Sequence, residues 1–132
     1  MDLLEISKRN NKKPVPLYIK ILSLFSVVRG YNILLIIVAQ YLASIFIFSP
    51  EKSLRNVLFD PQLYFIVFAT TCVIAAGYII NNFYDVEADR INRPIKSIID
   101  ALVTQKIKLR IYFLLNFMGF MVAFLVSWRA AM

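Results

Sequence analysis

Three long apolar stretches, none containing a charged residue, constrain this chain more than any other feature of its sequence. They cover residues 30–48, 63–80 and 111–128, and 60% of all residues are hydrophobic. A helix crosses the hydrocarbon core of a bilayer with roughly 20 mostly apolar residues. The alternative, three core helices of a soluble domain, would require more polar sequence than the 132 residues retain outside these stretches. The sequence therefore predicts an all-α, transmembrane helical fold with three spans.

The 15 Lys and Arg residues outnumber the 8 Asp and Glu residues, which in a soluble protein would suggest a nucleic-acid partner. Their distribution argues against that partner. Six basic residues precede the first stretch, two follow it, six lie between the second and third stretches, and one follows the third. This alternation is the positive-inside pattern of membrane proteins. It predicts a multi-pass protein whose N-terminus and second loop face the cytoplasm, where basic residues meet anionic membrane lipid.

The composition divides the chain into two parts. Residues 1–16 are basic and contain two prolines, which predicts a flexible tail, and residues 17–132 form the transmembrane helical domain. Residues 17–28 fit either an interfacial helix or the start of the first span, with a bend at Arg29. Residues 95–103 carry apolar side chains at helical spacing, which predicts a short amphipathic helix or an extension of the third span.

Polar and small residues inside the spans are few. Asn32 lies near the predicted cytoplasmic end of the first span, beside Arg29, and fits either a substrate contact or a hydrogen bond between helices. Gly77 and Gly119 are expected to let neighbouring helices approach closely. The chain has no His, which excludes imidazole acid–base chemistry and His-ligated metals, and its one cysteine cannot form an intrachain disulfide.

A cluster of polar residues follows directly on the second apolar stretch. Asn81, Asp85 and Asp89 are spaced by four residues, so on an α-helix their side chains drift by only about 40° per step and form one stripe. Two carboxylates and an amide carbonyl are hard oxygen ligands of the kind that Mg²⁺ prefers, whereas thiolate and imidazole favour Zn²⁺. Asn82 and Glu87 lie off this stripe and are not counted as ligands.

This stripe fits two interpretations. It either binds a metal ion and a diphosphate, or it consists of interfacial charges that end a helix. Ionisable groups near membrane depth are costly and usually face a cavity or a partner. Arg90 and Arg93 follow at once. Arginine binds phosphate through two hydrogen bonds, but both arginines could instead pair with the carboxylates.

Residues 81–94, with the sequence NNFYDVEADRINRP, resemble the first aspartate-rich motif of the UbiA-type intramembrane prenyltransferases. That motif reads N-D/N-x-x-D-x-x-x-D and is often followed by N-R-P. Asn81, Asp85 and Asp89 match its three ligand positions. Residues 27–32, VVRGYN, resemble the Arg-x-x-Asn entry to the first helix of the family. The resemblance covers the chain from the start of the first span to the third.

The resemblance implies a prenyltransferase that moves an isoprenyl group from its diphosphate to an acceptor, either an aromatic ring or a glycerol phosphate. In this family Mg²⁺ bound by the motif holds the diphosphate, which makes Asn81, Asp85 and Asp89 the implied metal ligands. Asp85 and Asp89 are also the implied catalytic residues. The implied substrate-binding residues are Arg29, Asn32, Arg90 and Arg93.

The chain also departs from the family pattern. Members have about nine transmembrane helices and a second aspartate-rich motif, whereas here three spans are predicted and Asp2, Asp60 and Asp100 are isolated. Asn82 stands where many members have Asp. We therefore expect the N-terminal third of a prenyltransferase, truncated and inactive alone, with a partner chain able to supply the remaining helices. The alternative is a non-catalytic small membrane protein or subunit whose acidic stripe binds a cation or a partner.

Overall fold

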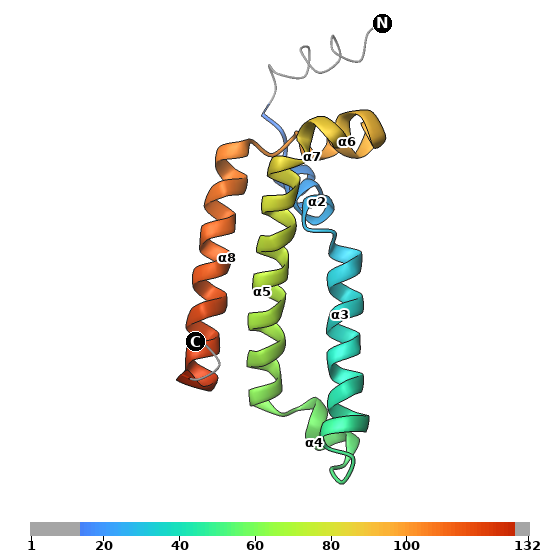
Figure 1. Ribbon diagram of the computed structural model, residues 1–132, viewed down its shortest axis with the longest axis vertical. Coiled ribbons are helices and arrows are strands. Elements are labelled where there is room, and N and C mark those ends of the chain that lie inside the picture. The colour runs from blue at the N-terminus through green and yellow to red at the C-terminus, as the bar shows by residue number, and fades with distance from the viewer. Residues whose placement is uncertain (1–13, 129–132) are drawn as a thin grey trace, which may run out of the picture.

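The computed structural model describes residues 14–128, and all regular structure in that part of the chain is helical. In chain order the helices are α2 (Leu17–Val27), α3 (Gly30–Ala43), the π-helical turn η2 (Ser44–Phe48), α4 (Leu54–Leu58), α5 (Pro61–Tyr84), α6 (Val86–Asn92), α7 (Pro94–Asp100) and α8 (Gln105–Val126). Figure 1 shows α3, α5 and α8 side by side with α5 in the middle, and α6 and α7 across one end. The all-α prediction is confirmed. Residues 1–13 of the predicted tail lie outside the described residues.

Three helical segments are long and apolar enough to cross a bilayer, which confirms the predicted number of spans. They are Gly30–Phe48 with 19 residues, Pro61–Tyr84 with 24 and Gln105–Val126 with 22. The second and third helices begin before the apolar stretches found in the sequence. Hydropathy detects the uncharged part of a helix, whereas the backbone hydrogen bonds of α8 already begin in its basic first turns.

Helix α2 is separate from α3, which decides between the two interpretations of residues 17–28. Helix α2 ends at Val27, and Arg29 adopts left-handed backbone angles (φ 51°, ψ 57°) directly before α3. The predicted bend at Arg29 is therefore present. A Cβ atom on Gly30 would lie only 2.1 Å from the ring of Phe25. The bend thus places this ring against the backbone at a position that glycine leaves open.

Helices α7 and α8 are also separate, so residues 95–103 do not extend the third span. Helix α7 ends at Asp100, and α8 begins at Gln105. The hydroxyl of Thr104 accepts a hydrogen bond from the backbone N–H of Ile107 (3.4 Å), which is the usual way a threonine caps the start of a helix. The short helix predicted in this loop is α7.

Helix α5 forms the core of the described structure and packs mainly against α8. Gly119 on α8 is buried at this contact. A Cβ atom there would lie 3.1 Å from Cγ2 of Val73 and 3.3 Å from the carbonyl oxygen of Ala69, so the expected close approach at Gly119 is confirmed. At Gly77 the described residues do not bear out the same expectation, because a Cβ atom there would meet none of their atoms within 4 Å.

Helix α3 is far less enclosed than α5. Of the most apolar 18-residue part of Gly30–Phe48, 0% is buried inside the structure, whereas 33% of the corresponding part of Pro61–Tyr84 is buried. Large apolar side chains such as Leu34, Leu35 and Phe46 stay exposed. An apolar surface of this extent is typical of a helix that is surrounded by lipid or by other transmembrane segments.

Candidate functional site

The aspartate-rich segment lies where α5 ends and α6 begins. Asp85 separates the two helices, and Figure 1 shows α6 leaving the axis of α5. The backbone N–H of Asp85 donates to the carbonyl oxygen of Asn81 (2.9 Å), and that of Asp89 donates to the carbonyl oxygen of Asp85 (2.8 Å). Helical hydrogen-bond spacing therefore continues through the break, but the predicted straight stripe is bent at its middle residue.

One narrow pocket with a volume of only about 10 Å³, called the ligand pocket below, is lined by the three predicted metal ligands. Its lining residues are Val27, Arg29, Tyr78, Asn81, Asn82, Asp85, Asp89 and Lys96. Asn81 and Asp85 are exposed, and Asp89 is half-buried. Within residues 14–128 these three side chains form no hydrogen bond or ion pair with the protein. Their oxygens are therefore available to an external cation.

Positive charge surrounds the same pocket. The guanidinium carbon of Arg29 lies 5.5 Å from the ring centre of Tyr78, within the range of a cation–π interaction. Both side chains line the ligand pocket, as does Lys96. Arg90 lines an adjoining pocket together with Asp89. Cations in this arrangement favour an anionic group such as a phosphate beside the carboxylates.

Two predicted substrate-binding residues are not among those that line these pockets. Asn32 is half-buried in the first turn of α3, and Arg93 is exposed between α6 and α7. The predicted alternative, in which Arg90 and Arg93 pair with the carboxylates of the stripe, is not observed. Among the residues that the structure describes, Lys96 forms an ion pair with Asp100 instead.

The oxygen atoms that line the ligand pocket fit a Mg²⁺ site in which the protein supplies only some of the metal ligands. Across the described residues, no three His, Cys, Asp or Glu side chains gather as a metal site. The stripe of Asn81, Asp85 and Asp89 instead offers two carboxylates and one amide. Mg²⁺ commonly keeps several waters and binds through one or two carboxylates together with substrate phosphates. Asn81, Asp85 and Asp89 would hold the ion, while water and phosphate oxygens complete its shell.

Comparison with known proteins decides the family. The sequence profile of the UbiA prenyltransferase family matches residues 37–132. The chain belongs to this family. It is also similar to digeranylgeranylglyceryl phosphate synthase of Pyrococcus horikoshii, with 30% identity over 104 residues, which are 79% of this chain and 35% of the relative. The chain thus spans about a third of the length of this curated relative. No solved structure matches this chain.

Family membership confirms the resemblance seen in the sequence motif. Together with the three apolar helices, it identifies this UbiA family chain as an integral membrane protein.

A second polar cluster of this UbiA family chain was missed in the sequence. Nζ of Lys108 donates to Oδ1 of Asn82 (2.8 Å), and Nδ2 of Asn82 donates to Oδ2 of Asp100 (2.9 Å). Nζ of Lys96 donates to the same carboxylate oxygen. Asn82 lies off the predicted stripe, and Asp100 has no acidic neighbour in the sequence. The one local signal was the four-residue spacing of Lys96 and Asp100, which suits an ion pair on a helix.

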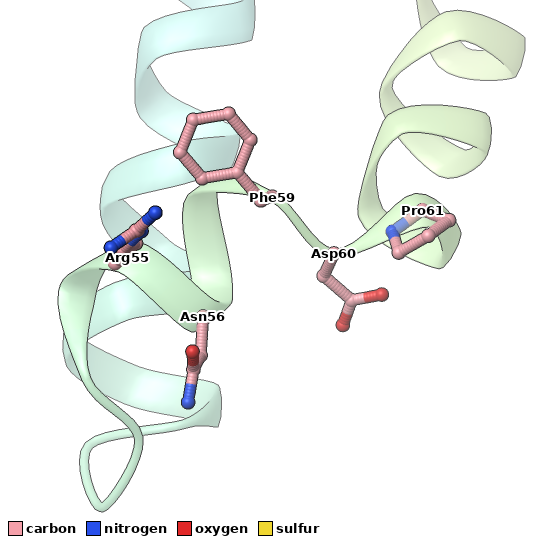
Figure 2. A pocket seen from close by; sticks show the side chains of 5 residues that line it. All are labelled: Arg55, Asn56, Phe59, Asp60 and Pro61. Atoms are coloured by element: carbon pink, nitrogen blue, oxygen red, sulfur yellow. The ribbon is translucent and has the colours of Figure 1, made fainter.

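A wider hollow lies at the opposite end of the long helices from these polar clusters. It has a volume of about 470 Å³ and is lined by Arg55, Asn56, Phe59, Asp60 and Pro61. Figure 2 shows these side chains around the turn between α4 and α5, with Asp60 beside Pro61 at the start of α5. The carboxylate of Asp60 accepts a hydrogen bond from the backbone N–H of Gln62 (2.9 Å). Asp60 therefore caps α5, and the hollow brings together none of the predicted site residues.

Proposed function

We propose that this chain forms the first metal–diphosphate half of a prenyltransferase active site, which moves an isoprenyl group from its diphosphate to an acceptor. The observation that carries the proposal is the one pocket shared by Asn81, Asp85 and Asp89. Family membership alone would not require these three oxygen-bearing side chains to meet in a single pocket. Mg²⁺ bound there would neutralise charge that develops on the departing diphosphate.

The side chains around the ligand pocket have distinct roles in this proposal. Asp85 and Asp89 supply negative charge to the cation, and Asn81 supplies a neutral oxygen. Arg29, held over the ring of Tyr78, faces the same pocket and would bind an oxygen of the diphosphate. Arg90 would approach the same anion from the adjoining pocket. Acidic groups thus hold the cation while basic groups orient the anion that the cation binds.

The acceptor that we propose is a glycerol phosphate rather than an aromatic ring. The relative that this chain resembles is named a digeranylgeranylglyceryl phosphate synthase. An anionic acceptor also suits the surroundings, because the basic side chains of Arg29, Arg90 and Lys96 line the two adjoining pockets.

We also propose that the N-terminus and the loop that carries the ligand pocket face the cytoplasm. The support is the six, two, six, one distribution of Lys and Arg along the chain. Topology reporters fused near Lys52 and at Met132 should both report the opposite side of the membrane. A cytoplasmic signal from the Met132 fusion would contradict this arrangement.

Isothermal titration of the chain in detergent tests the metal–diphosphate site. We expect Mg²⁺ to bind weakly by itself, because three protein oxygens leave most of its octahedral shell to water. An isoprenyl diphosphate should tighten Mg²⁺ binding. Asp85→Asn should weaken this diphosphate-dependent binding by about tenfold or more, since a lost contact to a charged group is worth about 1.5–3 kcal/mol.

Asp60→Asn is the matched control, because it removes the same charge at the far end of α5 and retains a capping oxygen. It should bind like the unaltered chain. Equal Mg²⁺ affinity with and without diphosphate would favour the alternative, a non-catalytic membrane protein whose acidic stripe binds a cation. An Asp85→Asn variant with full affinity would exclude the stripe as the site.

A further inference from the structure

The polar cluster beside the ligand pocket centres on a bridging amide. Asn82 accepts a hydrogen bond from the ammonium of Lys108 and donates one to the carboxylate of Asp100. These three residues, called the amide triad below, come from α5, α8 and α7 respectively. Their exposed fractions are 8% for Asn82, 3% for Asp100 and 2% for Lys108. The triad therefore joins three helices at one buried point.

Packing stability alone does not account for the amide triad. Burying a charged side chain is costly unless it is paired and hydrogen-bonded, and apolar residues of similar volume often stabilise a protein as well or better. Oδ1 of Asp100 is buried without a hydrogen-bond partner in the described part of the chain. A polar set that leaves one carboxylate oxygen unsatisfied is better explained by the geometry that it imposes on its neighbours.

The neighbours of the triad are the predicted metal ligands. Asn82 directly follows Asn81, and it lines both the ligand pocket and the adjoining pocket that Asp100 and Lys108 line. Asn82 is thus part of the wall between them. Changing a residue that holds the ligands of a metal in place typically lowers metal affinity by about 10- to 100-fold.

We propose that the amide triad is a positioning device. It fixes the last turn of α5 against α7 and α8, and so sets the direction in which Asn81 and Asp85 point. The ligand for which they are positioned rests on the proposed function above. None of the triad touches the reacting atoms, so Asn82, Asp100 and Lys108 act through Asn81 and Asp85.

Because its partner in this chain is Asp100, residue 82 must be able to donate a hydrogen bond, although many family members have Asp there. An amide can accept from an ammonium and donate to a carboxylate at the same time, whereas a carboxylate can only accept. Asn82→Asp would set two carboxylates against each other. Exchanging the two residues, in Asn82→Asp/Asp100→Asn, restores one donor and one acceptor at the same contact while Lys108 keeps its partner. Lys96 loses its carboxylate in this variant, but its side chain is 24% exposed and can turn to solvent.

The test uses the full chain in lipid nanodiscs, with Mg²⁺ and inorganic diphosphate as the probe. Asn82→Asp and Lys108→Met should each weaken Mg²⁺-dependent diphosphate binding about 10- to 100-fold, the range found for the partners of metal ligands. Both should also lose protection of the backbone amides of residues 81–92 from hydrogen exchange, measured without any ligand. The exchanged double variant should recover most of both properties.

Lys106→Met and Asn56→Asp are the matched controls, since they change the same charges at exposed positions. Both should leave binding and exchange as they are in the unaltered chain. Unchanged exchange and binding in Asn82→Asp and Lys108→Met would overturn the proposal. Losses that the double variant does not recover would also overturn it, because they would indicate general packing and not the donor–acceptor pattern.

The two measurements separate this inference from the proposed function. If the unaltered chain does not bind Mg²⁺ and diphosphate, the proposed function fails. Hydrogen exchange alone then tests whether the triad positions the end of α5. Lost protection that the double variant restores would then still support positioning of the α5 end, whereas unchanged protection would exclude it.

Discussion

Arg29 holds a backbone conformation that costs free energy. Its φ of 51° is the one positive φ among non-glycine residues in the described chain, and the left-handed region costs an L-residue about 1–2 kcal/mol. The side chain that accompanies this cost lies over Tyr78 and lines the ligand pocket. Backbone strain is often retained where it directs a functional group. At Arg29, the bend between α2 and α3 directs a positive charge at the pocket.

Substitutions of Arg29 should separate the strain from ligand binding. Arg29→Gly relieves the strain, so we expect its free energy of unfolding to exceed that of Arg29→Ala by about 1 kcal/mol. Both variants should lose the same share of Mg²⁺-dependent diphosphate affinity, because both lack the guanidinium. Thermal unfolding in detergent and isothermal titration measure the two effects. Equal stability of the two variants would contradict the left-handed geometry, and full affinity in either would remove Arg29 from the site.

The contact between α5 and α8 is close because Gly119 has no side chain. The position of a Cβ atom on Gly119 lies against Cγ2 of Val73 and the backbone carbonyl of Ala69. A backbone atom cannot move aside as the end of a flexible side chain can. A Cβ atom on Gly77 of α5 would instead have no atom of residues 14–128 within 4 Å. Of the two glycines, therefore, only Gly119 lies at a tight helix contact within the described residues.

Alanine at these two positions should have different effects. Gly119→Ala should lower the free energy of unfolding by about 1–3 kcal/mol, the usual cost of overfilling a packed contact. Gly77→Ala should leave it unchanged or raise it by up to about 1 kcal/mol, because alanine favours the helix. Unfolding of both variants in detergent provides the comparison. A larger loss at Gly77 than at Gly119 would mean that α5 and α8 pack through another face.

The described chain as a whole carries its polar chemistry at one end of three apolar spans. The ligand pocket and the amide triad both lie there, where Figure 1 shows α6 and α7 crossing the end of the long helices. The pocket offers two carboxylates, whereas a diphosphate carries several negative charges. One Mg²⁺ held by Asp85 and Asp89 would leave much of that charge uncompensated when the diphosphate departs.

We therefore expect residues 1–132 by themselves to transfer no prenyl group. A radiolabelled prenyl-transfer assay in membranes can compare this chain alone, a partner chain that supplies the later helices of a family member, and the two together. Turnover confined to the mixture, and abolished by Asp85→Asn or Asp89→Asn, would support the proposed function. Robust turnover by the chain alone would show that a second acidic motif is dispensable.

The sequence predicted the features that depend on composition and on local spacing. Three uncharged stretches predicted the spans, and the four-residue spacing of Asn81, Asp85 and Asp89 predicted one stripe of side chains, which line one pocket in the structure. The break at Asp85 was not predicted, because the residues on both sides of it suit a helix. The amide triad was missed for another reason. Its hydrogen bonds join residues 18 and 26 positions apart, and contacts between helices leave no periodic pattern in one sequence.

The ligand pocket lies at the end of exposed apolar helices, so the relevant concentration of its ligand is the one in the membrane. An isoprenyl diphosphate keeps its hydrocarbon tail in the bilayer and its charged head at the surface, so it would reach the pocket by lateral diffusion. The quantity that governs occupancy is then its mole fraction among the lipids and not its amount per volume of solution. Adding inert lipid at constant bulk concentration would dilute the ligand in two dimensions and empty the pocket.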